Sequence, residues 1–155
     1  MVWRSVFPAV NAILRNKEEA EDAMQDSIIK GFAKLSELKD AEKYPGWQKQ
    51  ISVRHALGLL RQRKDIIKLF EDVPDGVETD DGNALLQMDV GLVHQKLNHM
   101  PDGYRMSIQL HLIDGMSHDE IGDALGIAAS TSRSQYSRGI AQLKKELLAE
   151  YEKQI

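Results

Sequence analysis

Apolar side chains recur at three- and four-residue intervals along most of this chain, which is the spacing of one face of an α-helix. One such stripe covers residues 2–15, a second covers residues 18–38, and a third runs from Trp47 to about residue 70, after a break at Pro45-Gly46. No segment shows the alternation of β-branched and polar residues that is typical of a strand. The chain is therefore predicted to be all-α. The expected inward face of the second stripe is Ala20, Met24, Ile28, Phe32 and Leu35.

Helix boundaries are clearer in the second half of the chain. A short helix is expected over residues 92–99 and another from Pro101 to Ile113, since proline is favoured in the first turn of a helix. Ser117 and Glu120 have the spacing of a capping box, and the helix that they open should end at Gly126. A long helix follows about three residues later and runs towards residue 153. A helix, a tight glycine turn and a second helix are the outline of a helix-turn-helix.

The net charge of −4 is unevenly distributed along the chain. Residues 1–70 carry 13 basic and 9 acidic side chains, residues 71–91 carry seven acidic and no basic ones, and residues 92–155 carry 7 basic and 8 acidic ones. The middle segment also contains Pro74 and three glycines, as a solvated linker would. We expect two small helical domains, at residues 1–70 and 92–155, joined by an acidic linker at 71–91. A single domain with a long acidic surface loop is the alternative.

Several classes of protein are excluded by composition. The chain has no cysteine, so it has neither a disulfide framework nor a thiolate metal site. Its histidines show no metal-ligand spacing, and His118, directly after the expected cap serine, should be solvated. No nucleophile motif or phosphate-binding glycine loop is present, so neither enzymatic activity nor a cofactor is expected. The apolar runs are too short to span a membrane, and no signal peptide pattern follows Met1, so a soluble cytoplasmic protein is predicted.

The long C-terminal helix carries the candidate for DNA recognition. In a helix-turn-helix the second helix lies in the major groove, where arginine can pair with guanine and glutamine with adenine. An ordinary amphipathic helix with a hydroxyl-rich face would show the same pattern, and the helix alone does not separate these alternatives. The predicted base-reading residues are Ser130, Thr131, Arg133, Ser134, Gln135, Ser137 and Arg138.

Two motifs resemble one family. Residues 97–143, with Gly115-Met116-Ser117, Leu125-Gly126-Ile127 and the Thr131–Arg138 helix, resemble region 4 of bacterial sigma factors. Residues 20–26, Ala-Glu-Asp-Ala-Met-Gln-Asp, resemble the start of the core-binding helix of region 2. Because only these two regions and a short linker are present, the chain resembles extracytoplasmic-function sigma factors over nearly its whole length.

The chain also departs from the family pattern in places. His55 stands where asparagine is frequent, Ala128 where a serine usually opens the helix, Ser132 where valine is common and Gln135 where arginine is common. The form Ser132-Arg133-Ser134-Gln135 resembles a subset found in Bacteroidetes.

The resemblance implies roles for three groups of residues. Contact with core RNA polymerase is implied for Glu21, Asp22, Gln25 and Asp26. The loop at residues 38–46 is implied to capture a base flipped out of the opening promoter. A basic helix face would neutralise phosphates of the downstream promoter element. The residues expected at this element are Lys39, Lys43, Tyr44, Arg54, Arg61, Arg63 and Lys64.

The leading interpretation is a sigma factor whose partners are core RNA polymerase, promoter DNA and an anti-sigma factor, with no membrane insertion. The alternative is a stand-alone two-domain helix-turn-helix regulator in which residues 1–70 bind a partner or sense a signal. Co-elution with core polymerase and start-site-specific transcription would separate these two functions.

Overall fold

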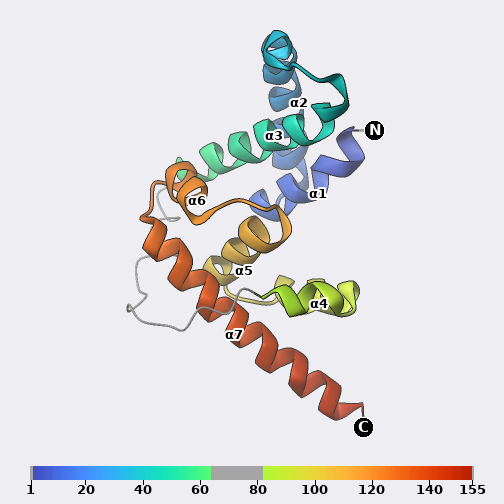
Figure 1. The fold of residues 1–155 in the computed structure, drawn as a ribbon, viewed down its shortest axis with the longest axis vertical. Coiled ribbons are helices and arrows are strands. Elements are labelled where there is room, and N and C mark those ends of the chain that lie inside the picture. Colours follow the sequence, from blue (N-terminus) through green and yellow to red (C-terminus); the bar gives the residue numbers. More distant parts are fainter. Residues whose placement is uncertain (1, 64–81, 155) are drawn as a thin grey trace. The chain divides into compact units, whose positions relative to one another are not determined.

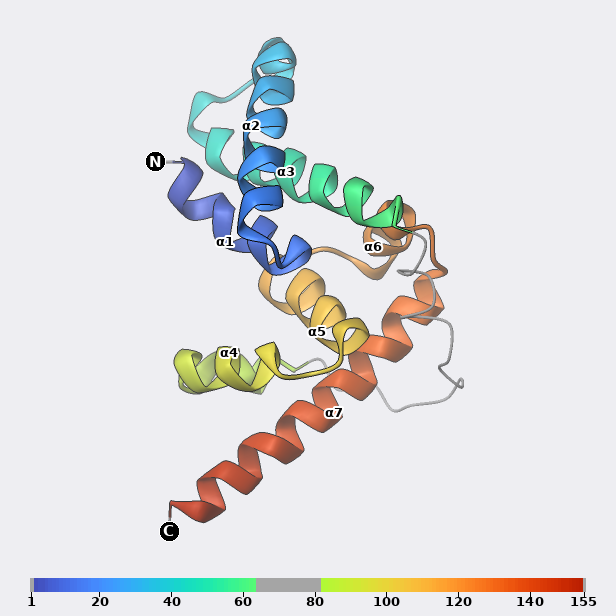
Figure 2. The same cartoon turned by 180° about the vertical axis from the view of Figure 1, so that it is seen from behind.

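The computed structural model describes residues 2–63 and 82–154. The chain divides into two compact units, Met1–Lys64 and Asp65–Ile155. None of the described residues lies in a strand, and the architecture confirms the predicted all-α fold. Figures 1 and 2 show the helices of each unit from opposite sides.

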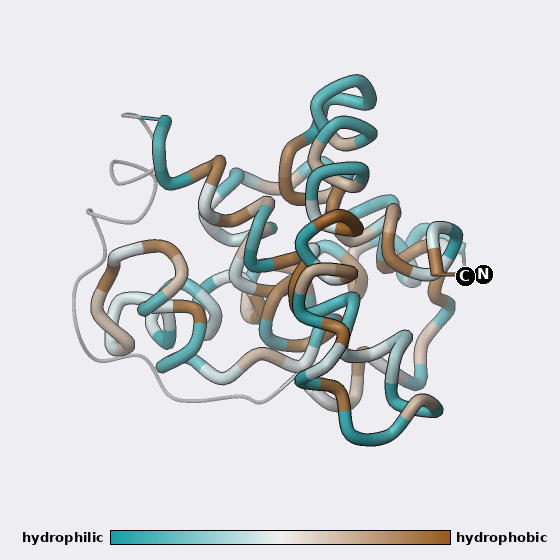
Figure 3. The backbone as a smooth tube through the Cα atoms, turned by 90° about the horizontal axis from the view of Figure 1, so that it is seen from above, coloured by the Kyte–Doolittle hydropathy of each residue, from teal (hydrophilic) through white to brown (hydrophobic). Residues whose placement is uncertain are grey.

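The N-terminal unit is a bundle of three helices, α1 (Val2–Leu14), α2 (Lys17–Ala33) and α3 (Tyr44–Arg61), each of which packs against the other two. Two short 3-10 turns, Leu35–Glu37 and Ala41–Lys43, connect α2 to α3. One side of each helix is buried and mostly apolar, and Figure 3 shows hydrophobic and hydrophilic segments alternating along the helices. Its most buried apolar side chains include Val6, Val10, Met24, Ala56 and Leu57.

Two predicted boundaries in this unit were wrong. Pro45 does not break the chain, because it stands in the first turn of α3, where its missing N–H has no helical partner to lose. Helix α2 ends at Ala33, five residues before the predicted end, and the chain continues as a 3-10 turn. The expected continuation of the third helix beyond residue 63 lies outside the described residues.

In the C-terminal unit, α7 (Ala129–Lys153) packs against three shorter helices. These are α4 (Val90–Asn98), α5 (Asp102–Ile108) and α6 (His118–Leu125), and α5 continues into a single π-helical turn at Gln109–Ile113. The core cluster consists of Leu85, Val93, Leu97, Met100, Ile108, Tyr136, Ile140, Leu143 and Leu147.

The structured C-terminal unit begins before the predicted end of the linker. A 3-10 turn covers Asn83–Gln87, and Leu85 is only 4% exposed because it packs in the core of this unit. Gly82, which precedes the turn, has a φ of 72°, a left-handed conformation that favours glycine. The solvated linker predicted over 71–91 is therefore too long at its C-terminal end, and residues 71–81 lie outside the described residues.

Candidate nucleic-acid interface

Helices α6 and α7 form the predicted helix-turn-helix. The Ser117 hydroxyl accepts from the backbone N–H of Glu120 at 3.1 Å, and the Glu120 carboxylate accepts from the N–H of Ser117 at 3.2 Å. This confirms the capping box. Gly126 ends α6 with a φ of 73°, as predicted. Ala128 precedes α7 and offers no side chain to cap it, so the first turn of α7 leaves its N–H groups open to an outside acceptor.

The first turns of α7 expose five of the seven predicted base-reading residues. Ser130 and Arg133 are exposed, and Thr131, Ser134 and Arg138 are half-buried. Gln135 and Ser137 are different, with only 4% and 3% of their surface exposed. The predicted base contacts of Gln135 and Ser137 do not fit this burial. Because α7 packs against α4, α5 and α6, its buried arc is wider than a single apolar stripe and includes these two polar residues.

Behind this surface, His118 joins α6 to α7. Its Nδ1 lies 2.9 Å from the Ser132 hydroxyl, and its ring stacks on His111 with centroids 4.1 Å apart. Tyr136 contacts the His111 ring edge-on at 4.6 Å. Burial of the His118 ring, with the nearby charges of His111 and Arg133, lowers its pKa to about 4. His118 is therefore only partly solvated, not fully as expected, and the ring is neutral at pH 7.

The π-helical turn at Gln109–Ile113 places His111 in this stack. A π turn adds a residue to the helix and changes the direction of the side chains that follow, a device frequent at functional sites. The His111 Nδ1 is 2.7 Å from the carbonyl oxygen of Met116, to which it donates. This bond fixes the ring against the loop that leads into α6.

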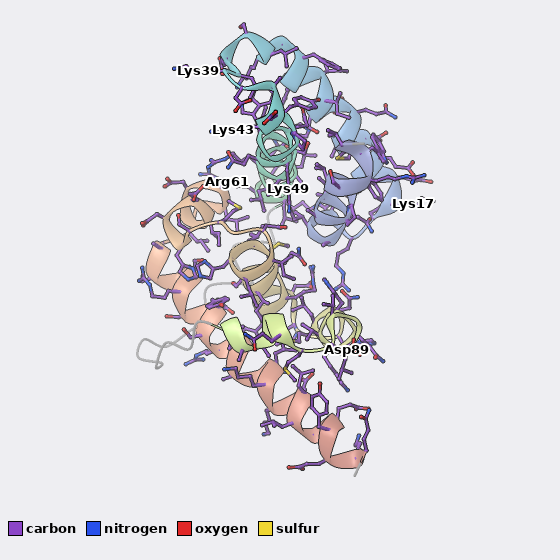
Figure 4. The ribbon with its side chains drawn as sticks, turned by 45° about the vertical axis from the view of Figure 1, so that its right-hand side comes forward. Lys17, Lys39, Lys43, Lys49, Arg61 and Asp89 are labelled. Atoms are coloured by element: carbon purple, nitrogen blue, oxygen red, sulfur yellow. The ribbon has the colours of Figure 1, made fainter. Side chains whose placement is uncertain are left out.

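Basic side chains of the N-terminal unit lie on the α2–α3 connection and on the outer face of α3. Lys39, Lys43, Arg54 and Arg61 are all exposed. Figure 4 shows Lys39, Lys43 and Arg61 projecting to the same side of the unit, away from Lys17. The predicted residues Arg54 and Arg61 are two helical turns apart and share one face of α3.

Two other residues predicted at the downstream element are placed differently. Arg63 is ion-paired with Glu19 of α2, so part of its charge is already neutralised within the unit. Lys64 lies outside the described residues.

Tyr44 begins α3 and is held by a buried polar network. Its hydroxyl donates to Gln48 Oε1 at 3.4 Å, and its ring lies 6.1 Å from that of Trp47. Gln48 Nε2 donates to the carbonyl oxygen of Ser27 at 3.0 Å and to the Ser52 hydroxyl at 3.1 Å. Both amide hydrogens of Gln48 are thus used towards α2 and α3, which turns its oxygen towards Tyr44.

The outer face of α2 contains the four residues expected at the polymerase. Asp22, Gln25 and Asp26 are exposed, and Glu21 is half-buried. Beside them stand two large apolar side chains, Ile29 and Phe32, which are 67% and 62% exposed.

The inward face expected for residues 18–38 was wrong at two positions, one in α2 and one in the 3-10 turn that follows it. Phe32 and Leu35, at 62% and 43% exposure, turn towards solvent, whereas Ser27 and Gly31 turn inward. Small residues line the buried side because α3 approaches closely, and a Cβ atom on Gly31 would lie 2.1 Å from Gln48 Oε1. Sequence analysis therefore missed Ile29 and Phe32 as surface residues.

His55 connects α3 to this outer face of α2. Lys30 Nζ lies 2.8 Å from His55 Nδ1 and, because an ammonium group only donates, Nδ1 accepts. The proton of the neutral ring is then on Nε2, which lies 4.0 Å from the Asp26 carboxylate. Burial and the charge of Lys30 lower the pKa of His55, which favours this neutral form.

Neither a metal-ligand cluster nor a membrane-spanning helix is found among the described residues. No set of three or more potential metal ligands is grouped among residues 2–63 and 82–154. No helix in the same part of the chain is both long and apolar enough to cross a membrane.

Residues 91–143 match the family model described as sigma-70, region 4. The extracytoplasmic-function sigma factor SigW of Bacillus subtilis is 28% identical, with 92% of this chain and 82% of that protein aligned. SigE of Mycolicibacterium smegmatis, also an extracytoplasmic-function sigma factor, is 29% identical over 85% of this chain and 53% of that protein. The chain is thus similar to RNA polymerase sigma factors over most of its length. The relatives support membership of the extracytoplasmic-function group.

The fold of this chain also has a solved counterpart. In the co-crystal structure of the sigma factor RpoE with the anti-sigma factor NepR from Bartonella quintana, the sigma chain superimposes with a TM-score of 0.54. The alignment covers 94% of this chain and 91% of that chain at 21% identity, a level that shows the fold.

Proposed function

We propose that this chain is a sigma factor that binds core RNA polymerase through α2 and directs it to promoters with two DNA-binding surfaces. Residues 1–70 would act as region 2, and residues 92–155, together with the Asn83–Gln87 turn and the start of α4 that belong to the same unit, as region 4. The acidic segment before this turn would act as the linker. The match of residues 91–143 to region 4 carries this proposal, because it coincides with the capped helix-turn-helix. The polymerase would perform the chemistry.

The α2 face is suited to a protein partner rather than to DNA. It combines acidic and amide side chains, Asp22, Gln25 and Asp26, with the exposed Ile29 and Phe32. Acidic groups repel phosphates, whereas exposed aromatic and aliphatic side chains are typical anchors of protein interfaces. We assign this face to core polymerase.

The two basic surfaces are suited to different tasks. Arg133 stands in the early turns of α7, where a side chain can reach base edges in the major groove. Arg54 and Arg61 lie on a basic helix face next to the Lys39–Tyr44 segment, where phosphate contact and capture of an unstacked base would support promoter melting. Recognition of the upstream promoter element is therefore assigned to α7, and promoter melting to α3 and the loop that precedes it.

An anti-sigma factor is a further proposed partner, supported by the similar fold of a sigma factor crystallised with one. The Ser132–Gln135 form additionally suggests relatedness to sigma factors of Bacteroidetes.

Run-off transcription tests the central proposal. The full chain is mixed with core polymerase and a pool of genomic fragments, and start-site-specific transcripts are expected. Nanomolar binding to DNA without polymerase at physiological salt, together with no co-elution with core enzyme, would instead indicate the stand-alone regulator.

Promoter selection from a library randomised at both elements tests the division of tasks. Arg133→Ala should change the preferred upstream bases, since a bidentate contact contributes about 1–3 kcal/mol of discrimination. Arg54→Ala with Arg61→Ala should weaken activity evenly and lower the salt dependence by about one ion for each lost phosphate contact. The assignment fails if Arg133→Ala leaves the upstream preference intact while the α3 variant alters it.

A further inference from the structure

Glycines in the interior of these helices have a structural explanation in three cases. A Cβ atom on Gly31 would meet Gln48 Oε1 at 2.1 Å, one on Gly122 would meet the backbone oxygen of Ile127 at 2.7 Å, and one on Gly139 would meet Ile108 and Tyr104 at 3.1 Å. Each of these glycines allows a close approach between neighbouring parts of the fold.

Gly58, in the middle of α3, has no such neighbour. A Cβ atom added there would have no heavy atom within 4 Å, apart from the adjacent residues and the backbone of its own helical turns. Glycine at an interior helical position costs about 1 kcal/mol relative to alanine. Glycine at position 58 therefore destabilises α3, and no group in the described part of the fold fills the space that a side chain would occupy.

The position of Gly58 on α3 indicates what uses this space. Gly58 is four positions after Arg54 and three before Arg61, so all three share the outer face of the helix. Trp47 and Ile51 continue the face towards the start of α3, whereas Ser52, Ala56 and Leu60 line the buried side. The two exposed arginines are about 10 Å apart along the helix axis, with a side-chain-free position between them.

We infer that Gly58 forms a close-contact point for the sugar-phosphate backbone of promoter DNA, with Arg54 and Arg61 binding phosphates on either side. Glycine allows a ligand to reach the helix surface itself. A side chain would hold the strand away by roughly 1.5 Å, the length of one carbon–carbon bond. Charge-assisted hydrogen bonds of arginine to phosphate are short, so this displacement would weaken both. The inference rests on the proposed downstream DNA contact and adds a residue that touches the DNA.

The test compares Gly58→Ala and Gly58→Leu with the parent in two measurements. In thermal unfolding of the full chain, alanine should raise the Tm of the N-terminal unit by roughly 2–8 °C, because helix propensity improves. In equilibrium binding of the sigma–core complex to a fluorescent promoter fragment, alanine should weaken binding about tenfold, the loss expected for one charge-assisted contact. Leucine should weaken it further. Ala149→Leu, at an exposed position near the end of α7, is the control for added size and should leave promoter binding unchanged.

A second background shows whether the arginines mediate the effect. When Arg54→Ala and Arg61→Ala are already present, Gly58→Ala should cause no further loss of promoter binding, because the contacts that it displaces are gone.

Four results for Gly58→Ala would overturn the inference. Two are unchanged promoter binding and a Tm below that of the parent. The others are an equal loss of promoter binding when Arg54→Ala and Arg61→Ala are present, and weaker binding to core polymerase in the absence of DNA. The last would show that the polymerase occupies the space. If the parent chain itself directs no promoter-specific transcription, the proposed function fails, and this is seen before any variant is compared.

Discussion

Lowering the pH from 7 to 4.5 is expected to destabilise the helix-turn-helix unit through His118. The folded-state pKa of this ring is about 4, below the ordinary value of 6.5 that applies in the unfolded chain. The neutral ring is therefore favoured by folding. The resulting stabilisation is complete above pH 6.5 and is lost progressively as the pH falls from 6.5 towards 4, since the unfolded state takes up the proton first.

The size of this effect follows from what surrounds the ring. His111 lies against one face, Arg133 approaches from α7 and Asp119 is the next residue in α6, so the neighbouring carboxylate opposes the lowering of the pKa by burial and by the other charges. Each tenfold change in proton affinity corresponds to about 1.4 kcal/mol, which gives an upper value of about 3 kcal/mol. Water reaches part of the half-buried ring, so screening reduces the expected change to about 1–2 kcal/mol.

Two measurements on the full chain check the prediction. NMR titration of the histidine ring signals should place His118 well below pH 6. Denaturant unfolding at pH 7 and at pH 4.5, followed by signals of the C-terminal unit, should show a stability loss in the parent that His118→Gln largely removes. His94→Gln, at an exposed position on α4, is the matched control and should keep the loss. Titration of His118 near 6.5, or the same pH dependence in His118→Gln, would refute the reasoning.

Two further predictions concern α2. Gly31→Ala should lower the free energy of unfolding by about 1–3 kcal/mol, because the added methyl group displaces Gln48 from its network; a chain that unfolds like the parent would contradict this packing. Asp22→Ala with Gln25→Ala, and separately Phe32→Ser, should change stability by no more than about 0.5 kcal/mol but weaken co-elution with core polymerase. Gln95→Ala on α4 is the exposed control, and undiminished core binding by both variants would remove α2 from the interface.

Much of the C-terminal unit could be predicted because the signals that start and end its helices are local in sequence. The Ser117–Glu120 capping box and the left-handed Gly126 depend on residues within one turn of each other, so sequence spacing is sufficient. The start of α3 was predicted too late because proline has two opposite effects: it breaks a helix from the inside but is favoured in the first turn, where Pro45 stands. The π turn that places His111 has no signal in the hydrophobic spacing.

The exposed and buried sides of α2 were misassigned for a physical reason. Hydrophobic periodicity assumes that apolar residues face the core, yet α3 packs so closely that serine and glycine line the contact. The apolar residues Ile29 and Phe32 are then left exposed on the outer face of α2. Gln135 shows the converse, since this polar residue near the start of α7 is buried, with only 4% of its surface exposed. Periodicity identifies a stripe, but only the arrangement of neighbouring helices decides what covers it.

The departures from the family pattern at His55 and Ser132 are explained by their partners. His55 accepts from Lys30 at 2.8 Å, and the fully buried Ser132 hydroxyl lies 2.9 Å from His118 Nδ1. The more usual valine at position 132 would leave His118 Nδ1 without its hydrogen-bond partner, because valine has no hydroxyl group. Loss of the partner of a buried polar group lowers the free energy of unfolding by about 1–3 kcal/mol. Valine fits this position only if residue 118 changes as well. Ser132 is thus one half of a hydrogen-bonded pair that holds α6 against α7.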